Sequence, residues 1–90
     1  MREYLKRDEM GIRKAVLELF LQDRAYTTEE VYSLLRNRGF NISYRGVSAM
    51  VGLMNTRLGI LSIDVTGDHN LYSLKQGHKE MVKSVLNSYT

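Results

Sequence analysis

The residue types that could perform acid–base or metal chemistry gather in one short segment, which holds Asp64, Asp68, His69 and Asn70. Carboxylates beside an imidazole can bind a metal or exchange a proton. Here, however, the cluster surrounds Gly67, a composition typical of a water-exposed turn, and no second histidine is near. The chain also lacks cysteine. We therefore predict no catalytic site, no metal site and no cofactor.

Positive charge is concentrated in the middle of the chain. No acidic residue occurs between Glu30 and Asp64, whereas that stretch contains four arginines: Arg36, Arg38, Arg45 and Arg57. Clustered positive charge is the electrostatic signature of nucleic-acid binding. The first two arginines fall in the last turn of a predicted helix, where the helix dipole favours cations without any ligand. Arg45 and Arg57 are left as candidates for contact with nucleic acid, with ordinary solvated surface as the alternative.

The segment from Ser43 to Arg57 is predicted to be a helix with two different faces. At 100° per residue, a buried stripe separates from a second face that consists mostly of small residues. The buried stripe comprises Val47, Met50, Val51, Met54 and Leu58, and the other face comprises Arg45, Ala49, Gly52 and Thr56. Glycine inside a helix costs about 1 kcal/mol relative to alanine. Gly46 and Gly52 therefore indicate a packing or functional reason for short side chains.

Entry into the major groove of DNA is one such reason, because the groove admits an α-helix. Arg45 could read guanine through its O6 and N7 atoms, and Ala49 or Thr56 could meet a thymine methyl group. Hydroxyls and amides of the first helical turn could bind phosphate. The predicted DNA contacts are Ser43, Tyr44, Arg45, Ser48, Ala49, Gly52, Thr56, Arg57, His69, Asn70 and Lys75. Close packing against another helix is the alternative for the same small-residue face.

Two predicted helices precede this one. The first runs from a cap at Asp8 to about Gln22, with a core-facing stripe of Ile12, Ala15, Val16, Leu19 and Phe20. After an extended link at residues 25–27, Thr27 and Glu30 have the spacing of a capping box. Gly39 supplies a left-handed end to this second helix.

The pattern changes from helical to alternating at Ile60, so residues 60–74 are predicted to form a β-hairpin. Leu61, Ile63 and Val65 fall on one side of its first strand, and residues 71–74 form the second strand. The turn between them holds His69 and Asn70. This tip carries Asp68 where a basic residue would suit phosphate, so we expect a modest contribution to DNA binding from the hairpin.

The order helix, link, helix, turn, helix, hairpin occupies residues 9–74, and the run from Arg13 to Leu74 resembles winged helix-turn-helix DNA-binding domains. The segment from Ser43 to Met54 resembles a small archaeal family of unknown function. The spacing of the second and third helices is also similar to the DNA-reading half of ferric-uptake-type repressors, without their metal-binding half. The resemblance implies an α+β fold with a three-helix core and a hairpin wing, in one domain over residues 1–90.

A fourth helix is predicted over about 77–89, with a broad apolar face. This face comprises His78, Met81, Val82, Val85, Leu86 and Tyr89. It either folds back over the first helix, beside Tyr4 and Leu5, or pairs with its counterpart in a homodimer, which we favour. A twofold dimer would space two recognition helices about 34 Å apart and predict a palindromic operator. His78 is predicted to be a packing residue.

Composition limits the remaining function classes. Ninety residues with a formal charge of +3 suit one small domain and leave little room for an enzyme. The absence of cysteine is typical of a reducing cytoplasm, and no apolar run is long enough to span a membrane. We therefore predict a cytoplasmic, sequence-specific double-stranded DNA-binding protein, plausibly a transcriptional regulator. The alternative is a winged-helix module that binds another protein.

Overall fold

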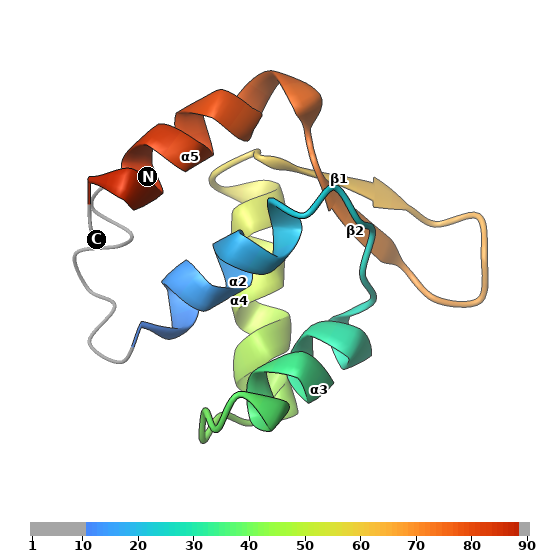
Figure 1. Cartoon of the computed structure of the whole chain (residues 1–90). Helices are drawn as coiled ribbons and strands as arrows, with labels where there is room; N and C mark the ends of the chain where they lie inside the picture. The colour runs from blue at the N-terminus through green and yellow to red at the C-terminus, as the bar shows by residue number, and fades with distance from the viewer. Residues whose placement is uncertain (1–10, 89–90) are drawn as a thin grey trace.

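A computed structural model of the chain describes residues 11–88. These residues form four α-helices, a 3-10 helix and a two-stranded antiparallel hairpin (Figure 1). The layout is compatible with a winged helix and agrees with the predicted α+β class. In chain order the elements are α2 (Ile12–Phe20), α3 (Thr28–Asn37), α4 (Tyr44–Thr56), β1 (Leu61–Asp64), β2 (Leu71–Leu74), η1 (Gln76–His78) and α5 (Lys79–Asn87).

Helix α2 has five buried residues, more than any other helix in the described part of the chain. It begins at Ile12, after Gly11 in a left-handed conformation with φ of +73°, whereas the cap predicted at Asp8 lies outside the described residues. Its buried residues are Ala15, Val16, Leu17, Leu19 and Phe20. Leu17 was not part of the predicted stripe, and its burial shows that the core covers more than one narrow face of this helix.

The predicted ends of α3 are confirmed. Thr27 Oγ1 accepts a hydrogen bond from the Glu30 N–H at 3.1 Å, and Glu30 Oε1 accepts one from the Thr27 N–H at 2.9 Å. This reciprocal pair satisfies two backbone donors that a helix start leaves without a partner. At the other end, Gly39 has φ of +92°, a conformation that strongly favours glycine. Helix α3 is therefore held at both ends by local interactions.

Helix α4 lies behind α2 in Figure 1 and crosses the centre of the molecule. Its start is capped as predicted, because Ser43 Oγ accepts a hydrogen bond from the Gly46 N–H at 3.0 Å. Val47, Val51 and Met54 are fully buried, and Met50 and Leu58 pack against the core while half-buried. The orientation predicted for this helix is confirmed.

The hairpin extends away from the helices (Figure 1). Leu61 pairs with Leu74 and Ile63 with Tyr72, and a loop over residues 65–70 joins the strands. Of the three residues predicted on one side, Leu61 is buried, but Ile63 is 40% exposed and Val65 is 64% exposed. The half-buried strand β2 continues along the helical body, where Tyr72 packs against the core, whereas β1 is exposed after Leu61.

Helix α5 folds back onto the core. It begins at Lys79 after the 3-10 turn η1, slightly later than predicted, and Val82, Val85 and Leu86 are buried. Met81 is 39% exposed, His78 is half-buried and Tyr89 lies outside the described residues. The expected dimer through this helix rested on an uncovered apolar face. That face is largely covered within one chain, so its burial requires no partner.

Candidate nucleic-acid interface

Helix α4, the hairpin and the start of α3 meet at a polar groove of about 220 Å³. Four of the predicted DNA contacts lie together here, two from α4 and two from the hairpin loop, although they are distant in the sequence. The lining residues are Thr27, Thr28, Glu29, Tyr44, Ser48, His69, Asn70 and Tyr72. The structure therefore joins the predicted recognition helix and the predicted wing in one surface.

Two contacts place the start of α3 at this groove. Tyr26, in the extended link before α3, forms an isolated bridge with Tyr72 of β2, with both backbone hydrogen bonds at 2.8 Å. The ring of Tyr32, one turn into α3, meets the ring of Tyr44 edge-to-face, with centroids 5.9 Å apart. Such edge-to-face pairs add stability beyond the area that they bury. The link thus pairs with the hairpin just before α3 begins, and the contact between Tyr32 and Tyr44 packs α3 against α4.

The groove offers neutral hydrogen-bonding groups and one carboxylate. Hydroxyls of threonine, serine and tyrosine, and the amide of asparagine, are groups that bind phosphate oxygens without carrying charge. Glu29 is exposed at the rim and repels phosphate there. Sequence reasoning missed Thr27, Thr28, Glu29 and Tyr72 as lining residues. The extended link at residues 25–27 was the available signal, because an extended segment beside a hairpin can pair with it.

The exposed face of α4 contains Arg45, Ala49 and Thr56, as predicted. Its two glycines have different surroundings. A Cβ atom added at Gly46 would lie 3.3 Å from Ile42 Cγ1, whereas one added at Gly52 would meet nothing within 4 Å. Packing within the chain therefore accounts for Gly46. It does not account for Gly52, which costs helix stability without relieving any contact in the described residues.

Two hydroxyls on α4 already make hydrogen bonds. Thr56 Oγ1 donates to the Gly52 carbonyl at 2.8 Å, an arrangement that leaves the threonine methyl group as its apolar contact. Ser43 Oγ accepts from Gly46, and a serine hydroxyl that accepts one bond can still donate another. Thr56 is therefore suited to an apolar partner such as a methyl group, and Ser43 to an acceptor such as phosphate.

Arg57 and Lys75 lie apart from the groove. Arg57 caps the end of α4, and the Lys75 N–H donates to the Ile60 carbonyl at 2.9 Å, at the base of the hairpin. His69 and Asn70 lie at the opposite end of the hairpin strands from Lys75. A strand rises about 3.3 Å per residue, so the four residues of β2 separate the two ends by roughly 13 Å. Six of the eleven predicted contacts thus form two groups, a polar groove and a cationic base, and the other five lie along α4 from its Ser43 cap to Thr56.

The acidic cluster of the hairpin is a turn. Asp64 Oδ1 accepts hydrogen bonds from the Thr66 side chain at 2.6 Å and from its backbone N–H at 3.0 Å. Both bonds lower the pKa of the Asp64 carboxyl from its ordinary value of 3.8, and the side-chain bond has the larger effect. Within residues 11–88, no group of three or more histidine, cysteine or acidic side chains could hold a metal ion.

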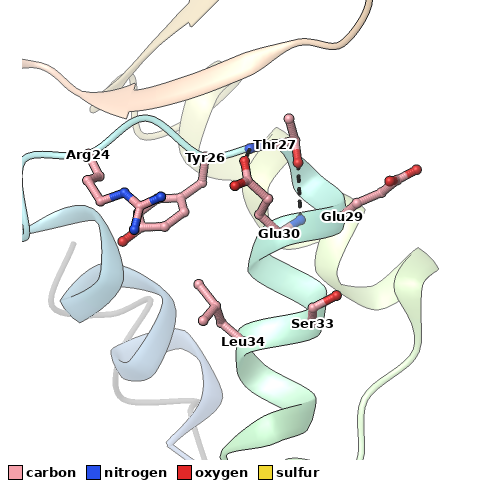
Figure 2. Close-up of a pocket in the computed structure, with 7 residues that line it drawn as sticks. All are labelled: Arg24, Tyr26, Thr27, Glu29, Glu30, Ser33 and Leu34. Atoms are coloured by element: carbon pink, nitrogen blue, oxygen red, sulfur yellow. Dashed lines mark hydrogen bonds between the residues drawn. The ribbon is translucent and has the colours of Figure 1, made fainter.

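A second concave surface of about 380 Å³ lies on the other side of the α3 start (Figure 2). Its lining residues are Arg24, Tyr26, Thr27, Glu29, Glu30, Ser33 and Leu34. The Arg24 guanidinium stacks over the Tyr26 ring, 5.1 Å from the centroid, and Glu30 is used by the capping box. Arg24 and Glu30 are therefore engaged in structural contacts, whereas Glu29 is exposed, so this surface does not favour a negatively charged ligand.

No helix in the described part of the chain has the length and apolar character needed to cross a membrane.

Comparison with known proteins places the chain in a family without assigning an activity. A family model described as "Protein of unknown function (DUF2551)" matches residues 1–82. An uncharacterized protein of the archaeon Archaeoglobus fulgidus is 42% identical over 89 residues, which are 99% of this chain and 91% of that protein. No solved structure matches the sequence significantly. The chain therefore belongs to the DUF2551 family of proteins of unknown function, which has an archaeal member.

Proposed function

We propose that this protein binds double-stranded DNA with α4 in the major groove and the hairpin against the adjacent backbone, as a winged-helix transcriptional regulator does. The observation that carries the proposal is the exposed face of α4 beside the polar groove. Gly52 has open space in front of it, although glycine weakens a helix. A partner that approaches the α4 backbone closely supplies the missing reason.

The dimensions of this face suit a short DNA site. Arg45 and Thr56 are eleven residues apart on one line of the helix, which at 1.5 Å per residue spans about 16 Å. That length covers about five base pairs at 3.4 Å each. Arg45, at the N-terminal end, would contact guanine, because helices of this kind read bases with their N-terminal residues. Ala49 and Thr56 would contact thymine methyl groups further along.

Contacts with the DNA backbone would come from both groups of predicted residues. Tyr44, Ser48, His69 and Asn70 line the groove and offer neutral donors to phosphate. Arg57, at the end of α4, and Lys75, at the base of the hairpin, are both exposed and would supply charge outside the groove. Because Glu29 opposes phosphate and the hairpin tip lacks basic residues, we expect the cations outside the groove to dominate the salt dependence.

A homodimer and a cytoplasmic location are part of the proposal. Two copies related by a twofold axis would read a palindromic site with half-sites about 34 Å apart. The burial of the α5 apolar face within one chain means that such a dimer would use another surface or form on the DNA. Sedimentation of the protein with and without duplex DNA separates these cases. The lack of cysteine suits a reducing compartment.

Fluorescence anisotropy of labelled random duplex DNA across a salt series tests DNA binding. If Arg45, Arg57 and Lys75 each neutralise one phosphate of random duplex DNA, the log–log salt slope is about 3, because each phosphate contact contributes about 0.9. Arg45→Ala and Arg57→Ala should each lower the slope by about 1. Lys83 belongs to α5, a helix that lies on the other side of the molecule from the hairpin loop in Figure 1. Lys83→Ala removes the same charge and should leave the slope nearly unchanged.

Absence of binding at low salt would refute the proposal, as would equal effects of all three substitutions. Either result would favour the alternative in which this fold binds another protein. Substituting RNA duplex of the same sequence provides a further control, because its deep and narrow major groove does not admit side chains as that of DNA does.

A further inference from the structure

Strand β1 is the outer strand of the sheet. β2 pairs with β1 on one side and, through Tyr72, with Tyr26 on the other. Both backbone hydrogen bonds to Tyr26 use the N–H and C=O groups of Tyr72. Directly opposed residues of an antiparallel pair either exchange both bonds or exchange none. Ile63, opposite Tyr72, therefore directs its N–H and C=O groups to the outer edge, where residues 11–88 provide no partner.

This edge has little protection against strand pairing. Native proteins protect exposed edges by short strands, charged side chains (lysine above all), proline or a bulge. β1 is four residues long and ends at Asp64, but the chain contains no proline and has neither lysine nor arginine between Arg57 and Lys75. Instead, two large β-branched residues are exposed at the edge, Ile63 at 40% and Val65 at 64%. Free backbone groups beside exposed apolar side chains are the features that strand addition uses.

The charge of the hairpin selects between the possible occupants. Asp64 and Asp68, both exposed, are its two charged residues. Pairing of β1 with the same strand of a second copy would place two acidic hairpins side by side, and charges of like sign repel each other. A segment that carries basic residues would meet the same carboxylates favourably. Charge complementarity therefore favours a basic segment over a second copy.

We propose that the outer edge of β1 binds an extended segment of a partner protein in which apolar residues alternate with lysine or arginine. The segment's backbone pairs with Ile63, its apolar side chains cover Ile63 and Val65, and its cations meet Asp64 and Asp68. This edge is separate from the exposed face of α4, so the inference does not rest on DNA binding.

Amide NMR spectra of the full chain, titrated with short blocked peptides, test this proposal. One peptide alternates valine with lysine, a second replaces lysine by glutamate, and a third is the lysine peptide with methylated valine amides. The lysine peptide should shift the amide signals of Leu61, Ile63 and Val65 and bind at least about fivefold more tightly than the glutamate peptide. Because the whole chain carries a charge of +3, nonspecific attraction would give the opposite order.

The variants and the methylated peptide separate strand pairing from other modes. Val65→Lys places a cation on the edge and should abolish binding of the lysine peptide. Because Val65 is exposed, this substitution should not disturb the core. Met81→Lys adds the same charge at an exposed residue of α5 and should leave that binding unchanged. The methylated peptide should not bind, because it lacks the donors that pair with β1.

Three results would overturn the proposal: equal binding of the lysine and glutamate peptides, shifts confined to residues outside the hairpin, or unimpaired binding to Val65→Lys. A concentration-dependent shift of the Ile63 amide without any peptide would likewise overturn it, by assigning the edge to a second copy of the chain.

Discussion

Gly52→Ala should stabilise the fold and weaken DNA binding. A Cβ atom at Gly52 meets nothing within 4 Å, so the helix gains about 1 kcal/mol from the better helix former. For a domain of this size, that gain corresponds to a rise in Tm of roughly 4–8 °C. If α4 approaches base edges at Gly52, the added methyl group must be accommodated at the DNA interface. Overpacking of that kind costs about 1–3 kcal/mol, or roughly a 5- to 150-fold loss of affinity.

Thermal unfolding followed by circular dichroism and the anisotropy titration measure both effects on one protein sample. Gly46→Ala is the matched control, because its Cβ atom would lie 3.3 Å from Ile42 Cγ1 and should reduce or cancel the stability gain. The reasoning fails if Gly52→Ala lowers Tm, since the space in front of Gly52 would then be filled. It also fails if DNA affinity is unchanged while Tm rises, since α4 would then not approach its ligand closely.

Three further predictions concern the fold that supports these surfaces. Thr27→Ala removes the side-chain acceptor of the capping box and should cost about 1 kcal/mol, measured as a lower urea midpoint; an unchanged midpoint would show that the cap contributes nothing. Leu86→Ala creates a cavity beneath α5 and should cost about 2–5 kcal/mol at every protein concentration, whereas a cost that depends on concentration would indicate burial between copies. Thr66→Val removes the side-chain bond that contributes most to the lowered pKa of Asp64, so an NMR titration of that carboxyl should show its pKa rise. In the native chain, the stabilisation from Asp64 is complete above the ordinary carboxyl pKa and is lost as pH falls through the lowered value; a Thr66→Val pKa equal to the native one would contradict this assignment.

Local interactions of the helices could be predicted from the sequence, because their signals lie within a few residues. The capping box of Thr27 and Glu30, the Ser43 cap and the left-handed Gly39 are all confirmed. The orientation of α4 followed from the spacing of its apolar residues, since a helix with one apolar face can bury only that face. These features needed no knowledge of distant contacts.

The surfaces of the molecule depended on contacts between distant segments. Spacing alone could not reveal that Tyr26 pairs with Tyr72 and brings the start of α3 to the groove. It also could not distinguish Gly46, which packs against Ile42, from Gly52, which faces open space. Both are interior helical glycines, and what a missing side chain leaves room for is a property of its neighbours.

Burial of apolar patterns was likewise decided by the tertiary structure. Ile63 and Val65 share the alternation of Leu61, yet they are exposed because β1 is the outer strand and only β2 continues along the body. Val85 and Leu86 of α5 are buried within the chain, although their pattern suited a dimer equally well. An apolar face has the same free-energy gain whether its own chain or another covers it. The sequence by itself therefore determined which faces are apolar, and the tertiary structure decided which of them remain available to a partner.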